Sequence, residues 1–298
     1  MVAPYLADLM QFSTFLDFPQ IGLCQDPHRI NFFFYLLFIT PNIVMFSLRT
    51  IQRRVINAAM LSTSTSTTST TIQTLHVYDH CPFCIRVDLI LNWNSISYQR
   101  KSYGYSDQNG PKALTGKKQL PVLEYTTNGE TKYMPESLDI IDFLINNNFA
   151  NSILQDDIQK QQLEDWNKSF KASVNDLTRS RILKMPPKFM DFATQEDRDY
   201  AMNKYISKGF SYEQAELNYE QALINCNESL VLFDKQFLTT EGKSIHGGDV
   251  YGMNDMLFLP DIRKLTCVKD LIWPDRVRKY VEEASNDGGV CLYDDWSC

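Results

Sequence analysis

The sequence has no excess of positive charge and no dense or regularly spaced set of cysteines. Lysine and arginine number 29 against 36 acidic residues, so the net charge is -7, and no basic domain stands out. Nucleic acid is therefore not expected as a partner. Seven cysteines in 298 residues, without regular spacing, exclude a disulfide scaffold and fit a reducing compartment. The length suggests two domains, and the apolar fraction of 44% is enough for sizeable cores.

The first 71 residues lack the pattern of a folded domain. Residues 43–74 contain arginines but no acidic residue, and residues 62–71 are all serine or threonine. This composition is typical of an organelle transit segment, most naturally one that begins at Met45. A start at Met60 would leave only a polar, disordered tail.

Two other interpretations of this leader stay open. It is either a dispensable extension from a mis-assigned start, or a membrane anchor through Phe32–Leu48, which Pro41 and Asn42 interrupt. We expect a cytoplasmic protein, or a mitochondrial or other organellar one if residues 45–71 act as a targeting signal. Membrane contact is expected only if the leader is retained.

A Cys-x-x-C motif follows directly after a predicted strand. Residues 72–78 are short and partly β-branched or aromatic, and residues 85–91 carry apolar side chains at helical spacing. Pro82 suits the first turn of a helix. Cys81 therefore lies where unpaired backbone N–H groups favour a thiolate, the nucleophile of disulfide exchange. Cys84 lies one turn inside the helix, close enough to resolve what Cys81 attacks.

The alternative is a zinc half-site made of His76, His80, Cys81 and Cys84. No second Cys-x-x-C or His-x-x-x-His completes such a site, and the two histidines fall in or just after the strand. A c-type haem would need histidine where Ile85 stands. The pattern therefore favours redox chemistry over metal binding.

Residues 72–148 predict a small α/β layer, and the remainder predicts helices. Further strands are expected over 96–103, from 119 to 125 with Pro121 at the strand start, and over 131–134 after an Asn128-Gly129 turn. Ser137 is a candidate N-cap for the next helix. Residues 146–157 read as a linker. Residues 158–298 carry helical apolar stripes, one of them running from Tyr212 to Phe237 with Cys226 as a core residue.

Four motifs in this order resemble the bacterial glutaredoxin 2 family. They are Tyr78–Cys84, Gly116–Leu123, Tyr133–Ile140, and Leu259–Thr266 with the Ile272-Trp273-Pro274 that follows. The resemblance covers about residues 73–284. It implies an α/β thioredoxin-like N-terminal domain over 72–148 and an all-α glutathione-transferase-like C-terminal domain over 158–298.

The resemblance also implies roles for single residues. Cys81 would be the attacking thiolate and Cys84 the resolving thiol, with Phe83 in place of the family's usual tyrosine. Glutathione would bind as co-substrate to the backbone of Leu120 before a cis-proline, Pro121. The remaining contacts would come from Glu136 and Ser137 to the γ-glutamyl end and from Lys118 to the glycine carboxylate. No metal or organic cofactor is expected, and the partners would be disulfide-containing or glutathionylated proteins.

Two rival functions use the same residues. One is a glutathione transferase or dehydroascorbate reductase that acts on a small electrophile, against which the second cysteine, Cys84, argues. The other is a binding module that holds an iron–sulfur cluster between two copies through Cys81 and glutathione. Pro82 argues against this module because it stiffens the loop beside the ligand.

Overall fold

The computed structural model describes residues 70–150, 159–184, 186, 189–239 and 243–296. They belong to one compact unit that spans Ser66–Cys298. The predicted targeting and anchoring segments, before residue 70, and most of the predicted linker lie outside the described residues. Among the helices that are described, none is long and apolar enough to cross a membrane.

The N-terminal half is a four-stranded sheet with the order β2-β1-β3-β4. β1 (Thr70–Val77) runs parallel to β2 (Gln99–Ser102) and antiparallel to β3 (Val122–Thr127), which pairs antiparallel with β4 (Glu130–Pro135). The tight turn between β3 and β4 is at Asn128 and Gly129, both with positive φ, as the sequence predicted. β1 begins two residues before the predicted start, and β2 is shorter than predicted.

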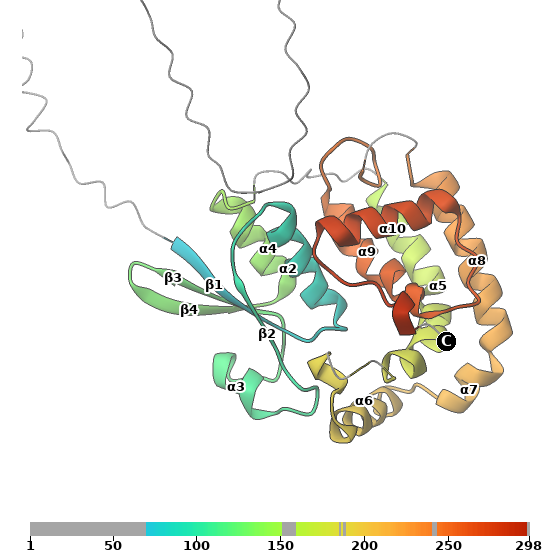
Figure 1. The fold of residues 1–298 in the computed structure, drawn as a ribbon, viewed down its shortest axis with the longest axis horizontal. Helices are drawn as coiled ribbons and strands as arrows, with labels where there is room; N and C mark the ends of the chain where they lie inside the picture. Colours follow the sequence, from blue (N-terminus) through green and yellow to red (C-terminus); the bar gives the residue numbers. More distant parts are fainter. Residues whose placement is uncertain (1–69, 151–158, 185, 187–188, 240–242, 297–298) are drawn as a thin grey trace, which may run out of the picture. The chain divides into compact units, whose positions relative to one another are not determined.

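Three helices complete this layer (Figure 1). α2 (Pro82–Trp93) and α4 (Ser137–Asn146) pack against each other on one side of the sheet, and α3 (Asn109–Thr115) lies on the other side near β4. Leu75 and Val77 of β1 are fully buried, as is Leu89 of α2. This arrangement confirms the expected thioredoxin-like layer, in which a short turn, residues 78–81, connects the end of β1 to the start of α2.

The C-terminal half is helical, as expected. Its elements are α5 (Lys160–Ile182), η1 (Met190–Phe192), α6 (Gln195–Ser207), α7 (Tyr212–Leu217), α8 (Tyr219–Gln236), α9 (Met253–Lys264), η2 (Leu265–Cys267), α10 (Asp275–Asp287) and η3 (Asp294–Trp296). Cys226 is buried in this core, as predicted. The stripe from Tyr212 to Phe237 is divided between α7 and α8. Asn218 ends the first helix and begins the second, and asparagine is a poor helix former.

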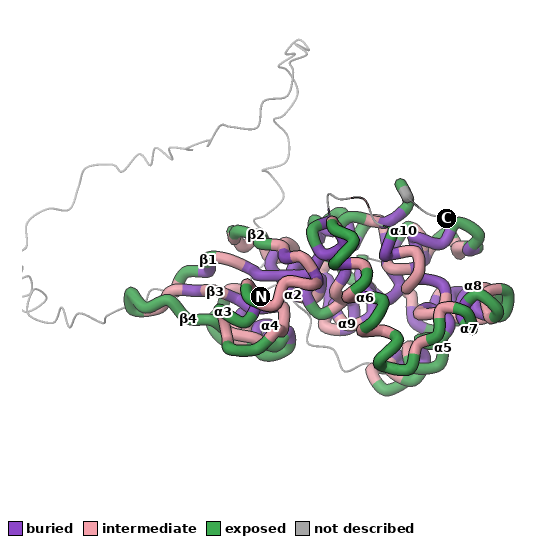
Figure 2. The backbone as a smooth tube through the Cα atoms, turned by 90° about the horizontal axis from the view of Figure 1, so that it is seen from below, coloured by how far each residue is buried: buried purple, intermediate pink, exposed green. Residues whose placement is uncertain are grey.

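The two halves share one continuous hydrophobic core. Figure 2 shows buried backbone running from the sheet through α2 into the helices of the second half. At this interface the indole Nε1–H of Trp93 donates to the carbonyl of Ala284 at 3.2 Å, and Asn92 Nδ2 donates to the carbonyl of Gly288 at 2.7 Å. The ring of Trp93 also stacks on Tyr251, with centroids 4.3 Å apart. The helical half therefore packs against the part of α2 that does not contact the sheet.

Candidate active site

Cys81 is the N-cap residue of α2, at the end of the turn that follows β1. Its backbone N–H donates to the carbonyl of Tyr78 at 3.2 Å, and its own carbonyl accepts the first helical hydrogen bond from Ile85 at 3.0 Å. Pro82 occupies the first helical turn without losing a hydrogen bond. Cys81 is partly exposed and Cys84 is fully buried. The sequence therefore places one cysteine within reach of a substrate and the other behind it.

The surroundings shift the pKa values of the two thiols in opposite directions. A hydrogen bond from Cys84, the charge of His80 and the backbone N–H groups of Phe83 and Cys84 outweigh burial and lower the pKa of Cys81 to about 6. Burial, together with that same hydrogen bond, raises the pKa of Cys84 well above its usual value. The Cys84 sulfur also accepts the backbone N–H of Tyr78 at 3.4 Å. At neutral pH Cys81 is therefore a thiolate nucleophile, and Cys84 remains a protonated thiol.

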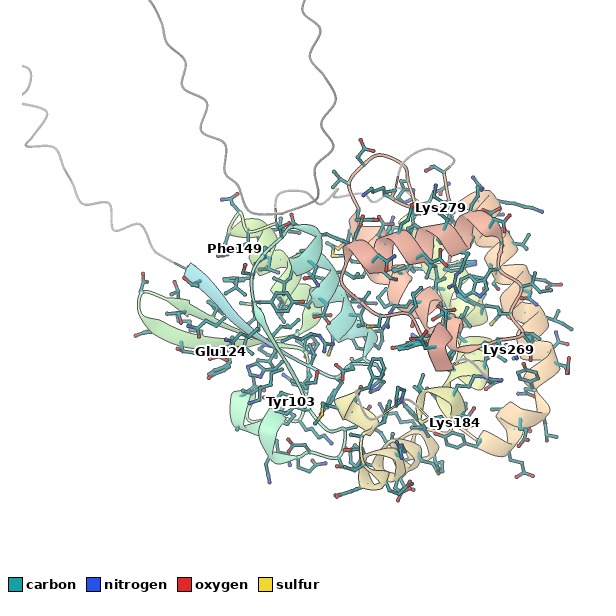
Figure 3. All side chains as sticks on the ribbon, in the orientation of Figure 1. Tyr103, Glu124, Phe149, Lys184, Lys269 and Lys279 are labelled. Atoms are coloured by element: carbon teal, nitrogen blue, oxygen red, sulfur yellow. The ribbon has the colours of Figure 1, made fainter. Side chains whose placement is uncertain are left out.

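The two histidines of the zinc alternative have other partners. The ring of His76 contacts the Tyr103 hydroxyl at 2.8 Å and the Glu124 carboxylate at 3.1 Å. Tyr103 directly follows β2 and Glu124 lies on β3, and both residues are labelled in Figure 3. His80 contacts Asp191 through its ring Nδ1. No group of three or more metal-ligating side chains occurs among the residues that the structure describes.

The residues expected to hold glutathione lie on adjoining segments. The Leu120–Pro121 peptide bond is cis, as the resemblance implied. Val122, the next residue, pairs with Pro135 at the end of β4, so the chain before α4 lies beside the Pro121 loop. Glu136 is exposed and has a φ of 71°, a left-handed conformation that a non-glycine residue rarely adopts. Such strain is typical of ligand sites.

Ser137 is not the N-cap of α4. The N-cap is Glu136, whose side chain makes no capping hydrogen bond, and Ser137 is the buried first residue of the helix. This corrects the capping role predicted from sequence. The left-handed backbone at Glu136 moves the start of the helix back by one residue, which leaves the N–H groups of the first turn beside the Pro121 loop.

Lys118 lies between the two halves of the protein. Its ammonium donates to the backbone carbonyl of Tyr105 at 2.5 Å and lies 3.6 Å from the centre of the Tyr200 ring on α6. The hydrogen bond from Lys118 lowers the pKa of Tyr200. The structure thus gives Lys118 protein partners, while its predicted contact with the glycine carboxylate of glutathione stays a prediction.

The helical half contributes to the site residues that sequence reasoning missed. Asp191 of η1 accepts the backbone N–H of His80 at 2.7 Å, and the N–H of Met190 donates to Asp79 at 3.0 Å. η1 therefore fixes the two residues before Cys81. No spacing pattern could have revealed this, because Asp191 is 111 residues from its partner.

A groove of about 520 Å³ runs from Cys81 along the helical half. It is lined on one side by the active-site turn and the Lys118–Leu120 loop, and on the other by α5, α6 and the end of α9. Its volume falls in the range of ligand sites. The groove therefore offers space for a ligand next to Cys81.

Comparisons with known proteins agree with this architecture. Residues 75–152 match the family model described as glutathione S-transferase, N-terminal domain, and residues 162–297 match glutaredoxin 2, C terminal domain. Glutaredoxin 2 of Escherichia coli strain K12 is 26% identical over 218 residues, which are 73% of this chain and 96% of that protein.

Solved structures share the fold. Glutaredoxin 2 from Salmonella typhimurium, solved in complex with glutathione, superposes with a TM-score of 0.67 at 22% identity and covers 78% of this chain and 100% of its own. FzlA from C. crescentus has a TM-score of 0.50 at 14% identity, covering 76% of this chain and 99% of its own. The two family models match successive parts of the chain, the first over the α/β layer and the second over the helical half. These matches support the glutaredoxin 2 family, and with it a glutathione-dependent oxidoreductase.

Proposed function

We propose that this protein reduces glutathione mixed disulfides and protein disulfides through Cys81 and Cys84, with glutathione as co-substrate. The observation that carries the proposal is the pairing of a partly exposed Cys81, whose pKa is lowered to about 6, with a buried Cys84 whose pKa is raised. A dithiol reductant needs this difference in pKa between its two cysteines. The thiolate attacks the substrate, while the protonated cysteine does not react until the mixed disulfide has formed.

With a glutathionylated substrate, the Cys81 thiolate attacks the glutathione sulfur. The bond between that sulfur and the substrate sulfur breaks, and the substrate leaves as a thiolate that takes a proton from water. The product on the enzyme is a disulfide between Cys81 and glutathione. A second glutathione thiolate then attacks the first glutathione sulfur, which releases glutathione disulfide and restores the Cys81 thiolate.

With a protein disulfide, the Cys81 thiolate attacks one of the two sulfurs and forms a mixed disulfide. Cys84 loses its proton and attacks Cys81, which closes the Cys81–Cys84 disulfide and frees the substrate as a dithiol. Two glutathione molecules reduce this bond in turn and leave as glutathione disulfide. The buried position of Cys84 keeps it away from substrates but within reach of Cys81.

Glutathione is proposed to lie along the Leu120–Pro121 segment. The backbone of Leu120 would pair with the tripeptide like an added strand. The first-turn N–H groups of α4 and the exposed carboxylate of Glu136 suit the carboxylate and ammonium of the γ-glutamyl end. The left-handed backbone of Glu136 supports this placement, because it opens the start of α4 towards the Pro121 loop.

Substitution of single cysteines tests the proposal. Cys81→Ser should abolish both reactions, whereas Cys84→Ser should keep deglutathionylation and lose most protein-disulfide reduction. Cys291→Ser serves as the matched control, because Cys291 is exposed and is not among the residues that line the groove. Loss of both activities in a folded Cys84→Ser protein, or retained activity in Cys81→Ser, would contradict the assignment.

A further inference from the structure

The groove beside Cys81 is strongly basic, although the chain as a whole has a net charge of -7. One acidic side chain, Asp261, lines it. The basic side chains that line it are Arg86, Lys118, Lys171, Arg179, Lys204, Lys208 and Lys264. The groove therefore has an excess of six positive charges in an acidic protein, and this contrast needs a ligand-based reason.

Most of these charges are not neutralised by acidic neighbours. Lys264 pairs with Asp261 at 2.6 Å, but Lys204 donates to the uncharged hydroxyl of Tyr105 at 2.8 Å. Lys171 and Lys208 are exposed, and neither ammonium makes a hydrogen bond or ion pair within the described part of the chain, although the charge of Lys171 acts on Asp261 and helps to lower its pKa. Their positive charge is available to a ligand in the groove.

Glutathione alone does not account for this excess. It carries two carboxylates and one ammonium, and its proposed site uses the Pro121 loop and the start of α4. Four of the cations lie instead on or just after the helices of the opposite wall, at Lys171 and Arg179 of α5, Lys204 of α6, and Lys208. They line the same groove as Cys81, on the wall that the helical half provides.

The charges are also spread along the groove. Lys171 and Arg179 are eight positions apart on one helix, which separates them by about 12 Å along its axis. An extended peptide covers that length with about four residues. Phe83, beside Cys81, is 51% exposed and offers an apolar contact at the same site. The lining therefore fits a chain segment with several carboxylates better than a single small anion.

We propose that this groove binds an acidic polypeptide segment next to the glutathionylated cysteine of the substrate protein. The proposal rests on the function proposed above and names its substrate class. The helical half would then select substrates by their charge, while the thioredoxin-like half carries out the exchange. Long-range attraction of this kind raises the rate of encounter and weakens as salt screens it.

The test uses three glutathionylated peptides of equal length, in which the cysteine is flanked by glutamate, glutamine or lysine. At low ionic strength we expect kcat/KM for the acidic peptide to exceed that for the neutral one by roughly tenfold or more, with the basic peptide slowest. The differences should largely disappear at about 1 M salt, where the screening length is about 3 Å.

The matched variants are Lys171→Gln with Lys208→Gln, and Lys132→Gln with Lys235→Gln. Both pairs remove two exposed lysines, but Lys132 and Lys235 do not line the groove. Only the first pair should slow the acidic peptide, and its effect on turnover of the neutral peptide should be much smaller. Equal effects of the two pairs would mean that net charge alone matters and would overturn the proposal.

Three other outcomes are decisive. Equal kcat/KM for the three peptides would overturn the acidic-substrate proposal and leave the oxidoreductase function intact. No turnover of any peptide would instead overturn the function itself. A short polyglutamate without cysteine should inhibit the neutral peptide's turnover more strongly than inorganic phosphate at equal charge. Stronger inhibition by phosphate would assign the groove to a small anion and contradict the peptide proposal.

Discussion

Asp191 and His80 join the helical half to the active-site turn through two hydrogen bonds on one oxygen. Oδ2 of Asp191 accepts the backbone N–H of His80 at 2.7 Å and also contacts Nδ1 of its ring. The other carboxylate oxygen is buried without a partner among the described residues. The ring of His80 lies between aromatic neighbours, including Phe192 with centroids 4.6 Å apart. The residue before the nucleophile is therefore fixed by an element more than a hundred positions away.

This contact predicts that Cys81 reactivity depends on the pair. The charge of His80 is one cause of the lowered pKa of Cys81, so His80→Gln should raise that pKa and slow alkylation at mildly acidic pH. Asp191→Asn should also slow this alkylation, because it removes the carboxylate that fixes the position of His80 next to Cys81. It should also destabilise the protein by about 1–3 kcal/mol, the cost of a poorly satisfied buried polar group.

The measurement is the pH dependence of iodoacetamide alkylation at Cys81, followed by mass spectrometry. Asp199→Asn is a suitable control, since Asp199 is an exposed acid on α6 whose carboxylate contacts only Gln195, at 2.8 Å, in the described structure. An unchanged alkylation midpoint in both His80→Gln and Asp191→Asn would show that the pair only holds the turn in place.

The lowered pKa of Cys81 also makes the stability of the reduced protein depend on pH. A thiol titrates near 8.5 in an unfolded chain, and Cys81 titrates at about 6 in the folded protein. Between these values the unfolded state binds more protons at this site, so stability rises with pH. Relative to Cys81→Ser, the reduced wild type should therefore gain free energy of unfolding from about pH 6 to 8.

Urea denaturation under reducing conditions across this range measures the difference. The stabilisation should be lost as the pH falls through the folded pKa of about 6. If the difference in free energy of unfolding between wild type and Cys81→Ser does not change between about pH 6 and 8, the fold does not stabilise the Cys81 thiolate.

The local chemistry of the site could be predicted from sequence because it depends on adjacent residues. The end of β1, Cys81 at the start of α2, and Cys84 one turn inside follow from a short apolar run and a proline, and the structure has them as predicted. The turn at Asn128-Gly129 is equally local. Each of these features is decided by a few neighbouring side chains.

Features that depend on distant contacts could not be predicted. The position of Asp191 beside His80 is fixed by the packing of η1, which no local pattern encodes. The N-cap at Glu136 depends on a left-handed backbone directly after Pro135, the last residue of β4 that pairs with β3. The break at Asn218 interrupts a periodic stripe that continues on both sides, so periodicity alone predicted one helix.

The close contact between α2 and the end of α10 predicts that Gly288 cannot be enlarged. A β-carbon at this position would overlap Leu89 and would lie 3.0 Å from the carbonyl of Ala284. Leu89 is fully buried, so its side chain would have to shift within a packed core. Gly288→Ala should therefore lower the free energy of unfolding by about 1–3 kcal/mol.

Chemical denaturation of the full chain checks this value. Asn286→Ala is the control, because the Asn286 side chain is exposed near the end of the same helix and should change stability by about 0.5 kcal/mol or less. A Gly288→Ala protein as stable as this control would mean that the two halves separate easily at this contact.

Lys118 offers a choice between a structural and a ligand-binding role. Its ammonium donates to the carbonyl of Tyr105 and lies over Tyr200, so Lys118→Gln should lower the free energy of unfolding by about 1–2 kcal/mol. The pKa of Tyr200 should rise towards its usual value, because the hydrogen bond from Lys118 is the main cause that lowers it. Lys118→Arg should recover part of the stability, since the charge remains.

Lys117→Gln is the control, because Lys117 is the exposed neighbour in the same loop. Urea denaturation, NMR titration of the Tyr200 ring and the KM for glutathione are measured together. A stability loss and a Tyr200 shift with little change in KM would establish Lys118 as a link between the loop and α6. A raised KM with unchanged stability would instead assign its ammonium to the glycine carboxylate of glutathione, because a ligand contact contributes nothing to the free protein.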